Sequence, residues 1–195
     1  MRAVKTAITT ALGLGLVGFV ATSLPAQAAV PTPTATYTEA ERAANNEASF
    51  QLVLKEALEH YRATGRARTL TYDASRARSF AQQISRSTEI WNAAVRNVQL
   101  APSNGQRADF TYTEGNFQQG SYVQGNKVHL DFKQNQQYDS VRVTTHETGH
   151  ILGLPDNYRG PCSELMSGGG PGPSCTNSQP NAQERQRVEQ RWGRG

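Results

Sequence analysis

Two histidines and a glutamate form the most chemically specific pattern in the chain. His146 and His150 are four residues apart, and Glu147 directly follows the first histidine. On an α-helix this spacing places both imidazoles on one face, one turn apart, where they can hold the same metal ion. Zinc lowers the pKa of a bound water to about 7, so a carboxylate placed like that of Glu147 can take its proton. The pattern predicts a hydrolytic zinc site.

A third ligand is expected, because catalytic zinc is usually held by three protein side chains with the fourth position open. Gly153 lies three residues after His150 and can take a positive φ that ends the helix and reverses the chain. Asp156 follows, and a turn at Gly153 and Pro155 would bring its carboxylate back to the metal. The alternative is that Asp156 only stabilises the helix end or a turn. The joint occurrence of the histidine pair and the glycine favours the ligand.

These residues are expected on a helix over 138–152, in a domain that contains both strands and helices. Residues 127–132 alternate between apolar and polar side chains, which is typical of a half-buried strand. That strand and residues 122–123 form a predicted hairpin across Gln124-Gly125-Asn126. The other expected elements are strands at 69–72, 98–100 and 108–112, a helix over 75–96 capped by Ser75, and a final helix over 181–192 capped by Asn181.

Residues 1–28 have the composition of a secretory signal peptide. Arg2 and Lys5 precede an uncharged apolar stretch over 7–21, and Ala26-Gln27-Ala28 matches a cleavage site. The alternative is a transmembrane anchor, but the apolar stretch is shorter than the roughly 18–20 residues that span a bilayer. No later segment of the sequence is apolar enough to span one. We therefore expect a secreted protein, cut after Ala28, in a compartment where disulfides persist.

Residues 29–66 differ in composition from the rest and are expected to be a pro-segment. They contain a helical pattern from Glu39 to Arg62, in which apolar residues recur every three or four positions and Gly65 ends the helix. Arg66-Ala67-Arg68 offers a basic processing point before the β-rich part begins. The alternative is that this helix is the first element of the mature domain. The expected division is a signal peptide at 1–28, a pro-segment at 29–66 and a catalytic domain at 67–195.

Composition excludes several classes of protein. The 195 residues carry 20 Lys and Arg against 16 Asp and Glu, and the basic residues are scattered, which disfavours nucleic-acid binding. Cys162 and Cys175 are the two cysteines, too few for a disulfide-scaffolded mini-protein. Since residues 29–66 contain no cysteine, a pro-segment there cannot silence a metal by thiolate ligation. His60 and His129 lack ligand spacing and are expected at the surface.

Three longer segments of the sequence resemble a known family. They are residues 134–140, 146–156 and 160–170, within a match that runs from about Thr69 to Trp192. The chain resembles the metzincin-like zinc endopeptidases, whose active-site helix ends at a glycine and which carry a Met-turn, and within them the snapalysin family of small neutral proteases. The resemblance implies an α+β fold with a small, twisted, mostly parallel or mixed sheet, an active-site helix and a C-terminal helix.

The resemblance also implies roles for individual residues. The zinc ligands His146, His150 and Asp156 and the base Glu147 match the family pattern. Tyr158 matches a tyrosine near the metal whose hydroxyl can stabilise an oxyanion, with simple packing as the alternative.

Met166 matches the Met-turn beneath the metal, where a flexible thioether suits packing. The alternative is an ordinary core methionine, and both can hold. A disulfide between Cys162 and Cys175 is implied as well, which would restrict a Gly- and Pro-rich loop by about 3 kcal/mol. Zinc ligation by the two cysteines is the alternative, disfavoured by the complete His/His/Asp set.

Family members further bind a calcium ion near the start of the active-site helix. Asp139 matches the family's carboxylate, and Val141 would contribute its backbone carbonyl. One carboxylate is a weak basis, because calcium takes 6–8 oxygen ligands. Asp139 serves equally well as a cap of the helix N-terminus.

The combined prediction is a secreted zinc endopeptidase that cleaves extracellular proteins, with one catalytic zinc and protein or peptide substrates. The resemblance implies a preference for an aromatic residue, especially Tyr, after the scissile bond. The strand over 128–132 is expected to be an edge strand that pairs with extended substrate. We expect a monomer, without nucleic-acid partners and without a membrane after signal cleavage. The alternatives are a zinc-binding protein without hydrolytic activity, which Glu147 disfavours, and a cell-wall amidase, for which no wall-binding repeat is present.

Overall fold

The computed structural model describes residues 38–64 and 69–193. The expected signal peptide at 1–28 and the processing point at 66–68 lie outside these residues. These residues cluster as one compact unit. Among the described helices, none combines the length and apolar character that crossing a membrane requires.

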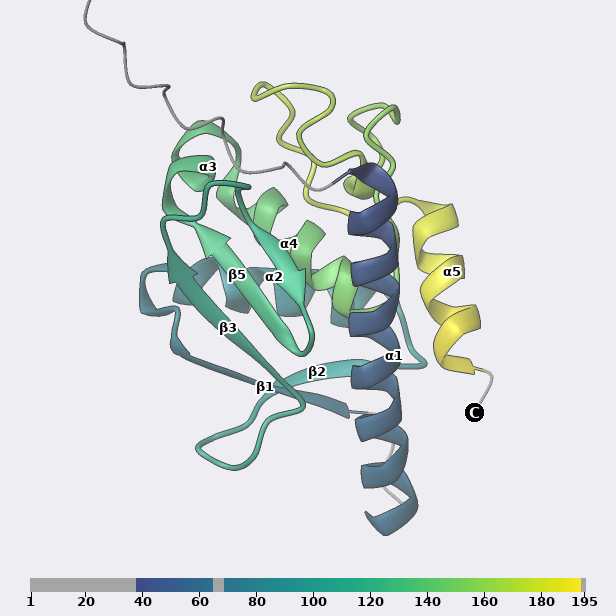
Figure 1. Cartoon of the computed structure of the whole chain (residues 1–195). Coiled ribbons are helices and arrows are strands. Elements are labelled where there is room, and N and C mark those ends of the chain that lie inside the picture. The colour runs from purple at the N-terminus through teal and green to yellow at the C-terminus, as the bar shows by residue number, and fades with distance from the viewer. Residues whose placement is uncertain (1–37, 65–68, 194–195) are drawn as a thin grey trace, which may run out of the picture. The chain divides into compact units, whose positions relative to one another are not determined.

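The described residues contain a five-stranded sheet (Figure 1), with the strand order β2-β1-β3-β5-β4. Four strands run parallel and the last is antiparallel. Apolar side chains alternate along each of the longer strands and face the core, as period-2 patterning dictates. The predicted α+β class with a mostly parallel, mixed sheet is thus confirmed. The strands are β1 (Thr69–Arg76), β2 (Gln99–Pro102), β3 (Phe110–Gly115), β4 (Tyr122–Gln124) and β5 (Lys127–Asp131).

The predicted hairpin is present, but its outer strand is not the one expected. β5 pairs in parallel with β3 and antiparallel with β4, so the prediction that residues 128–132 form an edge strand is wrong. The edge belongs to β4, in which Tyr122 faces His129. His129 is half-buried rather than at the surface, because its ring stacks on that of Tyr122 at 4.4 Å between centroids. The side chain of His60 lies outside the described part of the chain.

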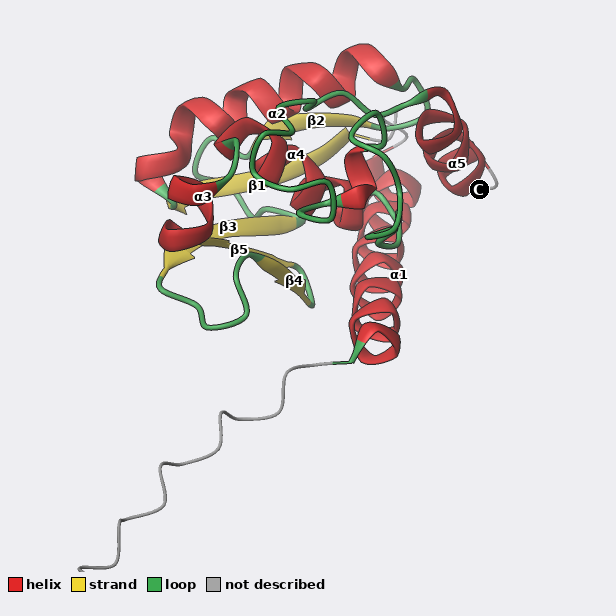
Figure 2. Cartoon of the chain, turned by 90° about the horizontal axis from the view of Figure 1, so that it is seen from above, coloured by secondary structure: helices red, strands yellow, loops and turns green. Residues whose placement is uncertain are grey.

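Helices pack against the sheet and against one another. Figures 1 and 2 show α4 between α2 and α1, with α5 beside α1. The α-helices are α1 (Glu39–Thr64), α2 (Ala81–Ala94), α3 (Phe132–Gln137), α4 (Ser140–Ile151) and α5 (Ala182–Gly193), and the two 3₁₀ turns are η1 (Arg78–Phe80) and η2 (Leu165–Ser167).

Two helix boundaries differ from expectation for local reasons. The helix predicted from Ser75 starts at Ala81, because β1 continues to Arg76 and Asp73 accepts hydrogen bonds from both the backbone and the hydroxyl of Ser75. Ser75 is therefore not a helix cap. The short helix α3 was not expected, and it forms where the Asp131 side chain accepts from Gln134 N at 2.6 Å and ends β5.

Two buried tryptophans tie neighbouring helices to α4. Trp91 of α2 donates its ring N–H to the carbonyl of Thr145 at 3.0 Å. Trp192 of α5 donates to the carbonyl of Leu152 at 3.1 Å. Both rings are fully buried, so each bond satisfies a polar group within the core. These bonds fix α4 from two sides.

Candidate metal centre

The predicted catalytic motif lies on α4, which is the most enclosed helix of the described chain. Every residue from Arg142 to Ile151 is buried. Asp139 caps its N-terminus, with a carboxylate oxygen that accepts from Arg142 N at 2.7 Å. The helix therefore begins close to the predicted position and has little freedom to shift.

Gly153 ends α4 and reverses the chain, as predicted. Its φ is +96°, a conformation that side chains of L-residues rarely adopt. Gly153 N donates to His150 O and Leu154 N donates to Gly149 O, at 3.0 and 2.9 Å, which is the Schellman pattern of a helix C-terminus. A Cβ at Gly153 would also lie only 2.8 Å from the ring of Phe50. The turn returns Asp156 to the face of α4 that carries the histidines.

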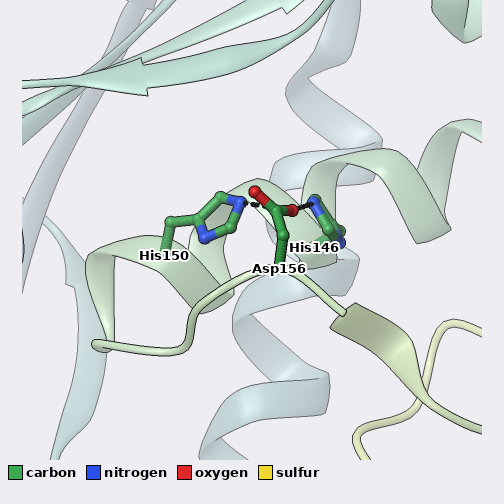
Figure 3. Close-up of side chains that lie close together, drawn as sticks. All are labelled: His146, His150 and Asp156. Atoms are coloured by element: carbon green, nitrogen blue, oxygen red, sulfur yellow. Dashed lines mark ion pairs between the residues drawn. The ribbon is translucent and has the colours of Figure 1, made fainter. Parts of the chain in front are cut away.

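His146, His150 and Asp156 meet in one buried cluster (Figure 3). Their metal-type ligand atoms all lie within 4.8 Å of one another. Asp156 Oδ1 is 3.2 Å from His146 Nε2 and 3.3 Å from His150 Nε2. The side chains are 7% or less exposed. The structure thus brings together the three residues that the sequence predicted as ligands.

Backbone carbonyls set the orientation of both imidazoles. His146 Nδ1 lies 3.1 Å from the carbonyl of Leu165, and His150 Nδ1 lies 2.7 Å from that of Leu154. A carbonyl only accepts, so each Nδ1 carries a hydrogen, and Nε2 is the nitrogen that faces Asp156 and offers a lone pair to a metal when the ring is neutral. This tautomer, fixed from behind by a backbone group, is the one that metal-binding histidines use.

The cluster fits a divalent cation, and its donor set fits zinc. Two ring nitrogens and one carboxylate match the three protein ligands of catalytic zinc sites. Asp156 Oδ1 is buried and makes no regular hydrogen bond to any described residue. Burial lowers the pKa of His150, but the Asp156 carboxylate outweighs it and raises that pKa to about 9. The cluster therefore attracts positive charge.

Glu147 and Tyr158 line the same cleft as the ligands. Glu147 is buried, its Oε2 has no hydrogen-bond partner among the described residues, and burial raises its pKa above the ordinary range of a glutamate. Tyr158 is 36% exposed. Burial and the carboxylates of Asp156 and Glu147 raise the pKa of Tyr158, so its hydroxyl stays protonated and can donate.

Met166 lies in η2, directly against α4. Its Sδ is 2.8 Å from the position that a Cβ on Gly149 would occupy, and Trp91 is 3.2 Å from the same point. Gly149 therefore lets both side chains approach the helix between the histidines. The carbonyl of Met166 accepts from Asn157 N at 2.7 Å and so joins this turn to the segment of Asp156. The predicted packing position of Met166 is present.

Glu184 holds the Met166 turn in place, a role that sequence reasoning missed. Its buried carboxylate accepts from Leu165 N at 3.1 Å and Met166 N at 2.7 Å. It also forms a capping box with Asn181, whose side chain accepts from Glu184 N. The Asn-x-x-Glu pattern signals the helix start, and the predicted cap at Asn181 is confirmed. No local pattern signals the bonds to the distant turn.

Arg142 was missed as well, although it lies one turn before His146. The buried guanidinium donates to the carbonyls of Glu164 and Gly168 and to the hydroxyl of Ser167. Carbonyl groups of an irregular loop are thereby satisfied inside the protein. Arg142 and Glu184 together fix the loop that orients His146.

The disulfide between Cys162 and Cys175 is present, with a Cα–Cα distance of 5.6 Å. Both cysteines are used in this bond, so the alternative that they ligate zinc is wrong. The bridge closes the loop next to η2.

The calcium prediction is not supported. The side chain of Asp139 is used as the N-cap, and the carbonyl of Val141 accepts from the Thr145 hydroxyl at 2.7 Å. The one metal-type group found among the described residues is the His146 cluster, and it does not include Asp139. The alternative role of Asp139, as a helix cap, is the one the structure has.

The helix with its two histidines, the aspartate returned by Gly153 and the turn at Met166 are the features expected of a zinc-dependent protease. Residues 67–195 match the model of the Streptomyces extracellular neutral proteinase (M7) family. The chain belongs to this family, which confirms the resemblance to the snapalysin family and the prediction of a secreted neutral metalloprotease.

Three relatives described as extracellular small neutral proteases agree with this assignment. That of Streptomyces lividans is 49% identical over 213 residues, covering 100% of this chain and 93% of the relative. That of Streptomyces caespitosus is 62% identical over 132 residues, covering 65% of this chain and 98% of the relative. That of Streptomyces coelicolor is 56% identical over 162 residues, covering 80% and 74%.

Proposed function

We propose that His146, His150 and Asp156 hold one zinc ion and that Glu147 is the general base in the hydrolysis of peptide bonds. The observation that carries the proposal is that the ligand atoms of His146, His150 and Asp156 lie within 4.8 Å of one another, beside the buried carboxylate of Glu147. Bound zinc would polarise the scissile carbonyl and acidify a bound water. The remaining chemistry belongs to the protein's own side chains.

Glu147 moves the proton. Its carboxylate accepts a proton from the attacking water and later delivers it to the leaving amine. Burial raises the pKa of Glu147, which brings it closer to the working pH of a neutral protease. Tyr158 donates a hydrogen bond to the oxyanion that develops on the scissile carbonyl, a role supported by its protonated hydroxyl and its place in the cleft.

The substrate is an extended segment of an extracellular protein. An extended peptide can add to β4, the edge strand of the sheet. We place an aromatic residue after the scissile bond in a hollow beside His146 and Glu147, which Tyr138 and Val143 line and which Arg42 of α1 narrows.

The chain is divided into a signal peptide at 1–28, a pro-segment at 29–66 and a monomeric catalytic domain at 67–195. Two comparisons support the last boundary. The family model begins at residue 67, and the Streptomyces caespitosus relative is covered over 98% of its length by 65% of this chain.

The test is hydrolysis of casein and of a fluorogenic peptide by the zinc-loaded secreted protein and by Glu147→Gln. We expect the substitution to lower kcat by about 10²–10⁴-fold, the usual contribution of a positioned general base. Glu89→Gln is the matched control, because Glu89 pairs with Arg86 at the surface with a side chain 60% exposed. An inactive wild type that still binds zinc would contradict the proposal and favour a binding protein, whereas release of peptidoglycan but not peptide would indicate an amidase.

A further inference from the structure

The cleft at the metal centre is closed on one side by a helix that lies before the family-matched region. Arg42 and Asn46 of α1 line the same cavity as Glu147, His150 and Tyr158. The cavity measures about 50 Å³. A volume of that order holds a few water molecules and no peptide segment. Side chains of α1 therefore fill part of the space that a substrate needs in order to reach the centre.

Asn46 contacts the ligand cluster directly. Its side-chain NH₂ group donates to Asp156 Oδ2 at 3.3 Å and lies 3.4 Å from His150 Nε2. The residue is 8% exposed. Its carboxamide is the same functional group as a peptide bond. The side chain therefore places an amide beside the ligand cluster, as a substrate would. It offers no scissile backbone bond there, because it is a side chain of a regular helix.

Asn45 hydrogen-bonds to a backbone group with which an extended substrate is expected to pair. Its side-chain NH₂ donates to the carbonyl of Val123 at 2.5 Å. Val123 is the central residue of β4, the edge strand to which an extended peptide would add. Two adjacent side chains of α1 thus engage the metal cluster and the sheet edge together.

Anchors further along α1 hold it in place. Phe50 is 2% exposed and packs edge-on against Trp192, with ring centroids 5.8 Å apart. The Arg191 guanidinium lies 4.0 Å from the Phe50 ring centroid and donates to both carboxylate oxygens of Glu47 at 2.6 Å. The cation–π contact and the ion pair, in which one guanidinium nitrogen bonds both carboxylate oxygens, help to fix the register of the helix.

We propose that α1 is an inhibitory helix, which keeps the uncut chain inactive by occupying the substrate cleft through Asn45 and Asn46. This inference rests on the proposed function, because it describes the regulation of the same site. Hydrolysis of one peptide bond between Thr64 and Thr69, with one water consumed, leaves a carboxylate on α1 and an amino group before β1. Docking then becomes bimolecular and loses the high effective concentration of a tethered segment. This mode of latency needs no cysteine.

The test uses the full chain from residue 29, with a recognition sequence for a specific protease inserted between Thr64 and Thr69. In a Glu147→Gln background, which cannot cut itself, binding of a fluorescent peptide substrate is followed by anisotropy before and after cleavage and dilution. We expect affinity to rise by about tenfold or more after the cut, since the competing segment is no longer tethered. In the parent chain, peptide hydrolysis should rise in parallel.

Point variants refine the same test. In the uncut chain, Asn46→Ala should raise peptide binding several-fold, whereas Lys55→Ala, an exposed residue of the same helix, should leave it unchanged. Equal binding and equal hydrolysis in cut and uncut protein would overturn the inhibitory role and make α1 a permanent wall of the cleft. If the cut protein binds peptide but never hydrolyses it, the proposed function fails and the inhibitory role stands.

Discussion

Two helices border the metal cleft, and they are held in different ways. Every residue of α4 from Arg142 to Ile151 is buried, and side chains from α2 and α5 bond to its backbone or to the residue after it. α1 buries one face only, through residues such as Asn46 and Phe50, and it lies outside the family-matched region. The comparison teaches that the three proposed ligands are built into the core, while one side of their cleft is closed by a helix that we propose to belong to a pro-segment.

Removal of the metal should have the largest effect, because the proposed ligands lie on and beside the buried helix α4. A chelator should abolish peptide hydrolysis, and restoring zinc to about 1,000 times its Kd should stabilise the folded chain by about 4 kcal/mol. Thermal unfolding with and without zinc measures the shift. Identical unfolding curves would mean that the cluster binds no metal in the folded state.

Phe50→Ala tests how strongly α1 is held against the rest of the protein. We expect it to weaken the docking of α1 by about 3 kcal/mol, as for other large-to-small substitutions of buried aromatic residues. Hydrogen exchange should show faster opening in α1 while protection in α4 is retained. A matched control is Leu52→Ala, because Leu52 is on the same helix and is 40% exposed. Equal loss of protection in both helices would show that they unfold as one unit.

Removal of the disulfide tests how strongly the stability of the protein depends on the loop that packs against α4. Replacing Cys162 and Cys175 together with Ser should lower the free energy of unfolding by about 2–3 kcal/mol, from the loop entropy released in the unfolded chain. Urea denaturation measures this change. Hydrolysis at low temperature should persist, because Arg142 and Glu184 still hold the Met166 turn.

The smallest effect concerns the pH dependence of stability and the hairpin of β4 and β5. Burial and the nearby Lys127 lower the pKa of His129 below 6.5. The folded state therefore favours the neutral ring, so this contribution to stability is present above pH 6.5 and is lost as pH falls through the folded-state pKa. His129→Gln should flatten the decline of the melting temperature between pH 7 and pH 5. An unchanged slope of melting temperature against pH would mean that groups other than His129 cause the pH dependence.

Residues that act through local spacing could be predicted from the sequence. His146 and His150 meet because a helix repeats every 3.6 residues, and Gly153 returns Asp156 because glycine tolerates a positive φ. The start of α5 was predictable because the Asn181 cap lies within one turn of its partner.

Other features depend on contacts between distant parts of the chain. Glu184 and Arg142 bind backbone groups of a loop far away in the sequence, and backbone groups carry no sequence signal. The hairpin of β4 and β5 was predicted, but which of the two lies at the edge depends on the pairing of β5 with β3, which hairpin patterning does not signal. Asn46 looked like an ordinary helix residue, and only the packing of α1 places it against His150.

The most direct test of the central claim is the zinc content of the purified secreted protein by inductively coupled plasma mass spectrometry. The wild type and the helix-cap variant Asp139→Asn should each carry one zinc per chain. Asp156→Asn should carry much less after dialysis against the same buffer, because an amide is a poor zinc ligand. A wild type without zinc, or an Asp156→Asn variant that retains it fully, would contradict the assignment of His146, His150 and Asp156 as the ligands.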